Sequence, residues 1–185
     1  MNHDYFKHIF LYIIPLWIIL ISGCKNIGEK EIVIISTNDI HGRIEQFPKL
    51  ATFVERIKTK HPNVILVDAG DRFTGNPYVD HAQEKGLPII SLMNDLGYEI
   101  GTLGNHEFDF GMDNFLEIAD EAQYKYLSCN FTSLETGEPV LDAYSIVEAG
   151  GMKIAFVGVS TPETFTKSTP KYFQNDEGEY IYSFA

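Results

Sequence analysis

Residues 31–42 read Glu-Ile-Val-Ile-Ile-Ser-Thr-Asn-Asp-Ile-His-Gly, an apolar run followed directly by polar side chains. The first part, Glu31–Thr37, is rich in β-branched residues, which is typical of a strand buried on both faces. In the second part, Asp39 and His41 are two residues apart, so on an extended segment they point the same way and can hold one ion. The stretch therefore predicts a buried strand that ends at a ligand-binding loop.

Strand and helix patterns alternate from this stretch to residue 129. Within residues 47–60, four apolar residues recur with the spacing of one helix face: Leu50, Phe53, Val54 and Ile57. The other expected elements are strands at 63–67, 98–103 and 126–129 and helices at 87–96 and 113–124. Repeated strand–helix–strand units favour an α/β fold with a parallel or mixed sheet and helices on its faces.

The pattern changes after residue 129. Two β-rich runs at 143–148 and 152–159 are separated by Ala149-Gly150-Gly151, which predicts an antiparallel hairpin. The tail at 161–185 is polar and has no clear period, with one further strand expected at 180–184. The sheet is therefore expected to be mixed.

Three polar clusters, at residues 37–42, 68–71 and 104–109, each follow a predicted buried strand. Because ligand sites form at the carboxyl ends of strands in open α/β sheets, we expect these clusters to lie close together. Carboxylate, imidazole and amide oxygen at one place suit Zn, Mn, Fe or Mg. Each residue alone also has an ordinary explanation, because Asp and Gly are common turn residues and Glu107 and Asp109 suit a helix start.

The composition indicates an acidic globular protein. The 185 residues are 44% hydrophobic, which provides a core and excludes a disordered chain. With 26 Asp and Glu against 14 Lys and Arg, the net charge is −12, so we expect no nucleic-acid binding. Phosphate-ester chemistry on such a protein needs a local source of positive charge, for which metal ions are suited.

The three clusters resemble the motif series of the calcineurin-like metallophosphoesterases. The matching residues are Asp39-x-His41, Gly70-Asp71 and Gly104-Asn105-His106-Glu107. Residues 36–42 and 105–111 are similar to the branch that contains 5′-nucleotidases, UDP-sugar hydrolases and 2′,3′-cyclic-nucleotide phosphodiesterases with 3′-nucleotidase activity. The resemblance implies a metallophosphoesterase-type sandwich. It also implies hydrolysis of a nucleotide phosphate monoester, or another small phosphate ester, by water activated at two divalent metal ions.

The resemblance also implies roles for the residues that match the motifs. Asp39 and His41 would bind the first metal ion, Asp71 would bridge both ions, and Asn105 would bind the second through its side-chain oxygen. Two such ions can polarise a phosphoryl group and lower the pKa of a bound water.

His106 and Asp109 resemble the catalytic pair of the family. By this resemblance, His106 would stabilise the charge of the phosphoryl transition state or of the leaving oxygen. Asp109 would orient His106.

The N-terminal region is typical of an exported lipoprotein. Residues 9–21 are thirteen residues without a charge, too short for a spanning helix, and Ser22-Gly23-Cys24 resembles a lipobox. The interpretation is a signal peptide at 1–23, a lipidated Cys24 with a tether at 24–30, and attachment to a bacterial membrane at the periplasm or cell surface. An N-terminal anchor helix with an incidental cysteine is the alternative.

The family pattern continues with further metal-binding histidines and a nucleoside-binding domain, but no histidine follows His106 in this sequence. We therefore expect residues 31–185 to be the N-terminal portion of the domain, incomplete at its C-terminal side. Such a chain would bind metal poorly and have little or no activity alone, and a separate C-terminal chain or domain would complete the site. A non-catalytic surface lipoprotein that keeps a relic of the fold is the alternative from a different functional class.

Overall fold

The computed structural model describes residues 30–185, of which residues 31–185 form one compact unit. The expected signal peptide and Cys24 lie outside the described residues. Among residues 30–185, no helix combines the length and the apolar character needed to cross a bilayer.

The core of the fold is a four-stranded parallel sheet with the order β1-β2-β3-β4. Its strands are β1 (Val33–Thr37), β2 (Val64–Asp68), β3 (Ile100–Thr102) and β4 (Lys125–Leu127). All four lie where the sequence predicts strands. Because the strands are parallel, the loops that follow them leave the same edge of the sheet.

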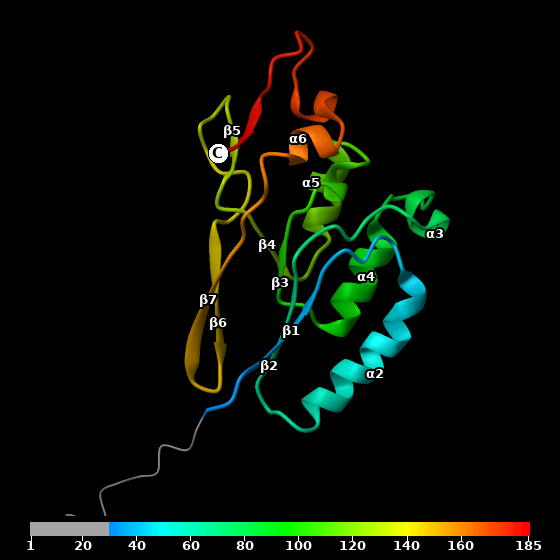
Figure 1. Ribbon diagram of the computed structural model, residues 1–185, viewed down its shortest axis with the longest axis vertical. Helices are drawn as coiled ribbons and strands as arrows, with labels where there is room; N and C mark the ends of the chain where they lie inside the picture. Colours follow the sequence, from blue (N-terminus) through cyan, green and yellow to red (C-terminus); the bar gives the residue numbers. More distant parts are fainter. Residues whose placement is uncertain (1–29) are drawn as a thin grey trace, which may run out of the picture. The chain divides into compact units, whose positions relative to one another are not determined.

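Helices cover one face of this sheet, as Figure 1 shows for α2 and α4. The helices between the strands are α2 (Phe47–Lys58), the short α3 (Pro77–Asp80), α4 (Leu87–Leu96) and α5 (Met112–Asp120). Leu66 of β2 and Ile35 of β1 pack with apolar side chains from these helices in the main hydrophobic core.

Helix α5 ends four residues earlier than its apolar pattern suggests. Asn94, on α4, accepts a hydrogen bond from the backbone N–H of Gln123 at 2.8 Å and donates one to the carbonyl of Glu121 at 2.9 Å. These bonds engage backbone groups that a longer helix would use internally, so the chain turns toward β4.

The strands after residue 129 form two antiparallel pairs apart from the parallel sheet. The expected hairpin is present as β6 (Tyr144–Ala149) and β7 (Met152–Val157), on the side of the sheet opposite α2 and α4 (Figure 1). A short β5 (Phe131–Ser133), which has no clear sequence signal, pairs with β8 (Tyr182–Phe184). The architecture is α/β with parallel and antiparallel pairing, although not in one continuous sheet.

The polar tail contributes more to the core than its composition suggests. It contains α6 (Thr164–Lys167) and a 3-10 helix η3 (Pro170–Phe173), and it returns to β5 through β8. Phe173 and Phe184 are buried, with ring centroids 5.0 and 6.0 Å from that of Phe108. Phe108 lies within the third polar cluster, so this aromatic packing anchors that loop to the core.

Candidate metal centre

Two of the three polar clusters bring metal-ligating atoms to one point. Asp39, from the loop after β1, and His41, two residues on, meet Asp71 from the loop after β2, with one ligand atom of each within 4.8 Å of the others. Asp39 is exposed, whereas His41 and Asp71 are half-buried. Two carboxylates and an imidazole are a donor set that suits a divalent cation, so these residues fit a metal ion. We call these three residues the open ligand group.

Backbone hydrogen bonds fix the two loops against each other. The N–H of Asp39 donates to the carbonyl of Gly70 at 3.0 Å, and the N–H of His41 donates to the carbonyl of Asp71 at 3.1 Å. These bonds extend the pairing of β1 with β2 beyond the last strand residues, Thr37 and Asp68. The register of the buried strands therefore determines which side chains meet.

The backbone of these loops is strained at the candidate ligands. Four non-glycine residues within 30–185 have positive φ, and all four lie here: Asp39 at 52°, His41 at 47°, Asp71 at 57° and Thr74 at 59°. Each such conformation costs on the order of 1–3 kcal/mol and persists only where the surrounding structure enforces it. Strain concentrated at one group of polar side chains points to a functional site.

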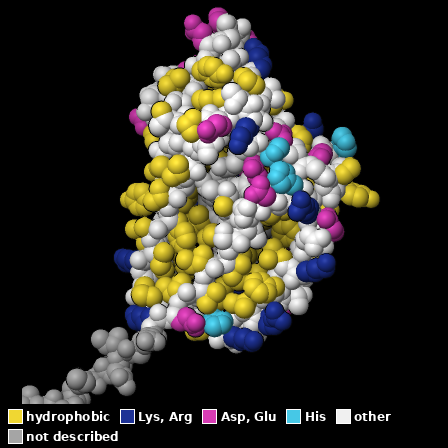
Figure 2. Space-filling view, in the orientation of Figure 1, with side chains coloured by type: hydrophobic (Ala, Val, Ile, Leu, Met, Phe, Trp, Pro, Cys, Tyr) yellow, Lys and Arg dark blue, Asp and Glu magenta, His cyan; other side chains and the backbone are white. Residues whose placement is uncertain are grey.

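The third cluster joins the same site. The N–H of His106 donates to Oδ1 of Asp71 at 2.9 Å, and the rings of His106 and His41 lie 4.7 Å apart in an edge-on arrangement. Nδ1 of His106 lies 2.6 Å from Oδ2 of Asp109. Asn105, half-buried, directly precedes His106 in this loop. The three clusters therefore come together as the strand pattern predicts, and Figure 2 shows histidine and acidic side chains next to one another at this surface.

Two solvent-accessible groups of the site, Asp39 and His106, have pKa values shifted from their ordinary values. Burial alone would lower the pKa of His106, but the hydrogen bond and charge of Asp109, with smaller contributions from Asp71 and Glu107, raise it overall. A hydrogen bond from Asn38 lowers the pKa of the exposed Asp39, and His41 lowers it further. The site therefore favours an anionic Asp39 beside a protonated His106.

A buried charge network lies beneath the open ligand group. It consists of Asp68, Arg72 and Glu107, whose side chains are fully buried. Arg72 Nη2 lies 2.7 Å from Oδ1 of Asp68, and its Nη1 lies 3.4 Å from Oε1 of Glu107. The guanidinium also stacks over the ring of Tyr126, with 4.8 Å to the centroid. Such full burial of three charged side chains requires that they be paired.

Glu107 uses this network to hold the ligand loops. Its carboxylate accepts hydrogen bonds from the N–H groups of Asp71 at 3.0 Å, Arg72 at 2.9 Å and Gly104. The loops after β2 and β3 are thus tied to one side chain. Sequence reasoning missed this role, because Glu107 suits the first turn of a helix and does lie in the short 3-10 helix η2 (His106–Phe108).

Glycine is required where the two loops touch. A Cβ on Gly70 would collide with the backbone of Gly104, and a Cβ on Gly104 would collide with the Asp71 carboxylate. Gly70 also has a φ of +101°, which side chains rarely adopt. The two glycines therefore permit the approach that places Asp71 beside the third cluster.

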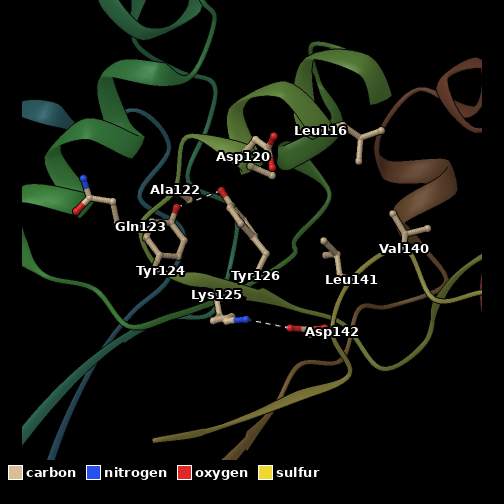
Figure 3. A pocket seen from close by; sticks show the side chains of 11 residues that line it. Leu116, Asp120, Ala122, Gln123, Tyr124, Lys125, Tyr126, Val140, Leu141 and Asp142 are labelled. Atoms are coloured by element: carbon tan, nitrogen blue, oxygen red, sulfur yellow. Dashed lines mark hydrogen bonds and ion pairs between the residues drawn. The ribbon is translucent and has the colours of Figure 1, made fainter.

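A separate hollow of about 490 Å³ lies on the β4 side of the sheet (Figure 3). Figure 3 shows Tyr124 and Tyr126 at its wall, with the Lys125–Asp142 ion pair at its rim. None of the candidate metal ligands lines it. The hollow is therefore distinct from the candidate metal centre.

Taken together, the fold and the site define a metal-dependent phosphoesterase class, and comparison with known proteins identifies the family. Residues 32–180 match the calcineurin-like phosphoesterase family, so the chain belongs to it. Members of this family are phosphoester hydrolases that use divalent metals.

Curated relatives carry several phosphoesterase names. The chain is 31% identical over 174 residues to the endonuclease YhcR of Bacillus subtilis, covering 78% of this chain and 14% of that protein. It is 31% identical over 180 residues to the 5′-nucleotidase of Rattus norvegicus, covering 85% of this chain and 30% of that protein. It is 26% identical over 174 residues to a 2′,3′-cyclic-nucleotide 2′-phosphodiesterase/3′-nucleotidase of Yersinia enterocolitica, covering 79% of this chain and 27% of that protein. The chain thus spans less than a third of the length of these relatives.

The fold is also similar to part of a longer solved structure. A 5′-nucleotidase precursor from Thermus thermophilus superposes with a TM-score of 0.66 at 28% identity, covering 72% of this chain and 29% of that one. The sequence-based expectation of a 5′-nucleotidase-type metallophosphoesterase fold is confirmed.

Proposed function

We propose that this protein hydrolyses nucleotide phosphate monoesters with two divalent metal ions, Zn, Mn, Fe or Mg. The observation that carries the proposal is the convergence of Asp39, His41 and Asp71 at one point, with His106 hydrogen-bonded to Asp71. In this proposal Asp39 and His41 bind one ion, Asp71 bridges both, and Asn105 binds the second. The ions would polarise the phosphoryl group and activate a water molecule.

The chain's own residues would orient the substrate phosphate. With Nδ1 of His106 donating to Asp109, Nε2 is left to face a phosphoryl or leaving-group oxygen. The raised pKa of His106 favours the protonated ring, which would stabilise developing negative charge on that oxygen. His106 and Asp109 are the catalytic pair of the proposal.

Metal ions would also offset the electrostatic repulsion between the protein and a phosphate substrate. A phosphate dianion is repelled by a chain with a net charge of −12, and the open ligand group itself contains two carboxylates. Divalent cations held there would reverse the local sign of the potential and attract the substrate.

We further propose that a C-terminal chain or domain completes the site. The open ligand group offers three ligands, and no histidine follows His106 in the sequence. The exposed face of the β6–β7 hairpin supports a protein partner, because Tyr144, Ile146 and Val157 are 53–61% exposed there. Figure 2 shows hydrophobic side chains gathered over this part of the molecule. Contiguous exposed apolar surface of this kind marks protein contacts.

The open ligand group has three ligands, and no histidine after His106 is present to add another. We therefore expect the 185-residue chain alone to bind metal weakly and to turn over slowly. The test is hydrolysis of AMP after loading with Mn²⁺ or Zn²⁺, compared with 2′,3′-cyclic AMP, a UDP-sugar and a DNA duplex. AMP should be preferred, and Asp71→Asn should abolish what activity there is. Turnover by the chain alone near the 1–10³ s⁻¹ typical of enzymes would contradict the need for a partner.

The remaining outcomes of this assay separate the alternative functions. Faster hydrolysis of the cyclic nucleotide or of the UDP-sugar would favour those branches of the family. A chain with no ordered metal, and with behaviour unchanged in Asp71→Asn, would support a non-catalytic surface module that retains the fold.

We also propose export and lipidation at Cys24, which would tether residues 31–185 to a bacterial membrane. The lipobox-like Ser22-Gly23-Cys24 supports it. Metabolic labelling with a fatty-acid analogue should tag the wild-type chain and leave Cys24→Ala untagged. Labelling of both chains would contradict the assignment.

A further inference from the structure

The hydroxyl of Thr74 lies within hydrogen-bonding distance of both members of the proposed catalytic pair. Its Oγ1 is 2.9 Å from Oδ2 of Asp109 and 3.1 Å from Nδ1 of His106. The same Oδ2 of Asp109 is 2.6 Å from Nδ1 of His106, so the three atoms form a closed triangle. Thr74 belongs to the loop after β2, whereas His106 and Asp109 belong to the loop after β3.

Counting protons excludes one of the possible acceptors for the Thr74 hydroxyl. The short contact between Nδ1 of His106 and the Asp109 carboxylate requires the proton on Nδ1, since a carboxylate only accepts. Nδ1 therefore cannot accept from Thr74, and the hydroxyl proton has two remaining acceptors. These are Oδ2 of Asp109 at 2.9 Å and the carbonyl of Phe73 at 2.8 Å. When Thr74 donates to Asp109, that oxygen is held from two sides and cannot turn away from His106.

The backbone at Thr74 shows that its placement is enforced. A β-branched residue at φ +59° is a conformational outlier, and glycine, which adopts positive φ freely, follows it at Gly75. The structure nevertheless keeps a hydroxyl-bearing side chain at the strained position. Strain of this kind persists where the surrounding contacts fix a functional group.

We propose that Thr74 is a positioning residue that holds Asp109, and through it the ring of His106, in the orientation that leaves Nε2 free for the substrate. The proposal rests on the proposed function for its catalytic consequence, because Thr74 would act only through His106 and Asp109. Its structural part, a His106 ring fixed by Asp109 and Thr74 together, stands independently of any activity.

The test combines a spectroscopic and a kinetic measurement on the 185-residue chain. The variants are Thr74→Val, which removes the hydroxyl, and Thr74→Ser, which keeps it. Thr52→Val is the matched control, because Thr52 donates to the carbonyl of Pro48 on the exposed side of α2. Thr74→Gly removes the hydroxyl and relieves the positive φ, so it replaces Thr74→Val if the valine variant does not fold.

Nuclear magnetic resonance of the histidine rings gives the first readout. The wild type, Thr74→Ser and Thr52→Val should each show a slowly exchanging Nδ1–H proton for His106. Thr74→Val and Thr74→Gly should lose that signal to exchange broadening while the backbone spectrum remains that of the folded chain. An unchanged Nδ1–H signal in both hydroxyl-free variants would overturn the proposal.

Kinetics with the Mn²⁺-loaded chain and AMP give the second readout. Thr74→Val should lower kcat about tenfold with KM within twofold of wild type. Thr74→Ser, which keeps the hydroxyl, should have the kcat of the wild type. If the wild type turns over and Thr74→Val matches it, the inference fails while the proposed function stands. If the wild type neither binds Mn²⁺ nor turns over AMP, but the His106 signal depends on Thr74, the proposed function fails while the positioning role stands.

Discussion

The buried charge network and the open ligand group lie next to each other and carry similar side chains, yet they are built in opposite ways. In the network, Asp68 and Glu107 are fully buried and both are paired with Arg72. In the open ligand group, the side chain of Asp39 is 60% exposed and that of His41 is 30% exposed, and the contact between them is a loose 3.5 Å. The network has its positive charge built in, whereas the open ligand group has two carboxylates and a histidine.

This difference indicates that the buried network supports the loops, whereas the open ligand group is suited to binding an ion. Because Glu107 accepts hydrogen bonds from the N–H groups of Asp71, Arg72 and Gly104, the network holds the ligand loops whether or not an ion is bound. The open ligand group can then carry unbalanced negative charge at little cost, since solvent screens it. The network should therefore control stability, and the open ligand group should control metal affinity.

The largest effect should follow from removing the positive charge of the network. Arg72→Met leaves the carboxylates of Asp68 and Glu107 buried without their partner, which should lower the free energy of unfolding by about 3–5 kcal/mol. Urea titration monitored by circular dichroism measures it. Arg56→Met is the control, because Arg56 is exposed and only stacks on Phe53, and it should cost less than about 1 kcal/mol. Equal losses in the two variants would remove the distinction between the regions.

The opposite pattern is expected in the open ligand group. Asp39→Asn should change the free energy of unfolding by no more than about 0.5 kcal/mol, because the side chain is exposed. It should nevertheless weaken Mn²⁺ binding at least about tenfold, since a charged ligand is lost. Calorimetric titration measures the affinity, with Asp95→Asn on α4 as the control for one exposed carboxylate. A stability loss without an affinity loss would reverse the assignment.

A smaller effect is expected at the hairpin face, which we propose receives a partner. Ile146→Lys should leave the free energy of unfolding within about 1 kcal/mol and reduce concentration-dependent self-association in light scattering, because Ile146 is 53% exposed. Leu134→Lys, at an exposed apolar residue outside the hairpin, should leave association unchanged. If both variants reduce association equally, the hairpin face has no special role.

The smallest effect concerns the pH dependence of stability. The pKa of His106 is raised above its ordinary 6.5, so its contribution to stability is complete below that value and is lost as the pH rises through the folded-state pKa. The difference in unfolding free energy between wild type and His106→Gln, measured in chelator, should therefore shrink from pH 6 to pH 9. A difference that grows with pH would show that the pKa is lowered instead.

The parallel sheet and the meeting of the three clusters were predictable because both follow from buried strands and the polar residues after them. Helix α4 matches the expected 87–96 because Gly97, at φ +76°, ends it with a strong local signal. The early end of α5 was not predictable, since it depends on Asn94 from another helix. Long-range contacts also explain why the short β5 and the core role of Phe173 escaped prediction.

The same reasoning applies to the site. The motif residues Asp39, His41 and Asp71 were identifiable from their position after strands, and the structure brings them together. The side chains of the buried charge network were not identifiable in this way. Nothing in the sequence around Arg72 distinguishes a buried arginine from a solvated one. Thr74 likewise gains its role only when the loops after β2 and β3 pack together.

Mn²⁺ titration of the 185-residue chain and of Asp71→Asn, followed by electron paramagnetic resonance, tests the central claim most directly. The wild type should bind Mn²⁺ weakly but saturably, and Asp71→Asn, with its fold intact by circular dichroism, should lose at least about tenfold in affinity. Identical titrations for the two chains would show that the loops after β1 and β2 do not form a metal centre.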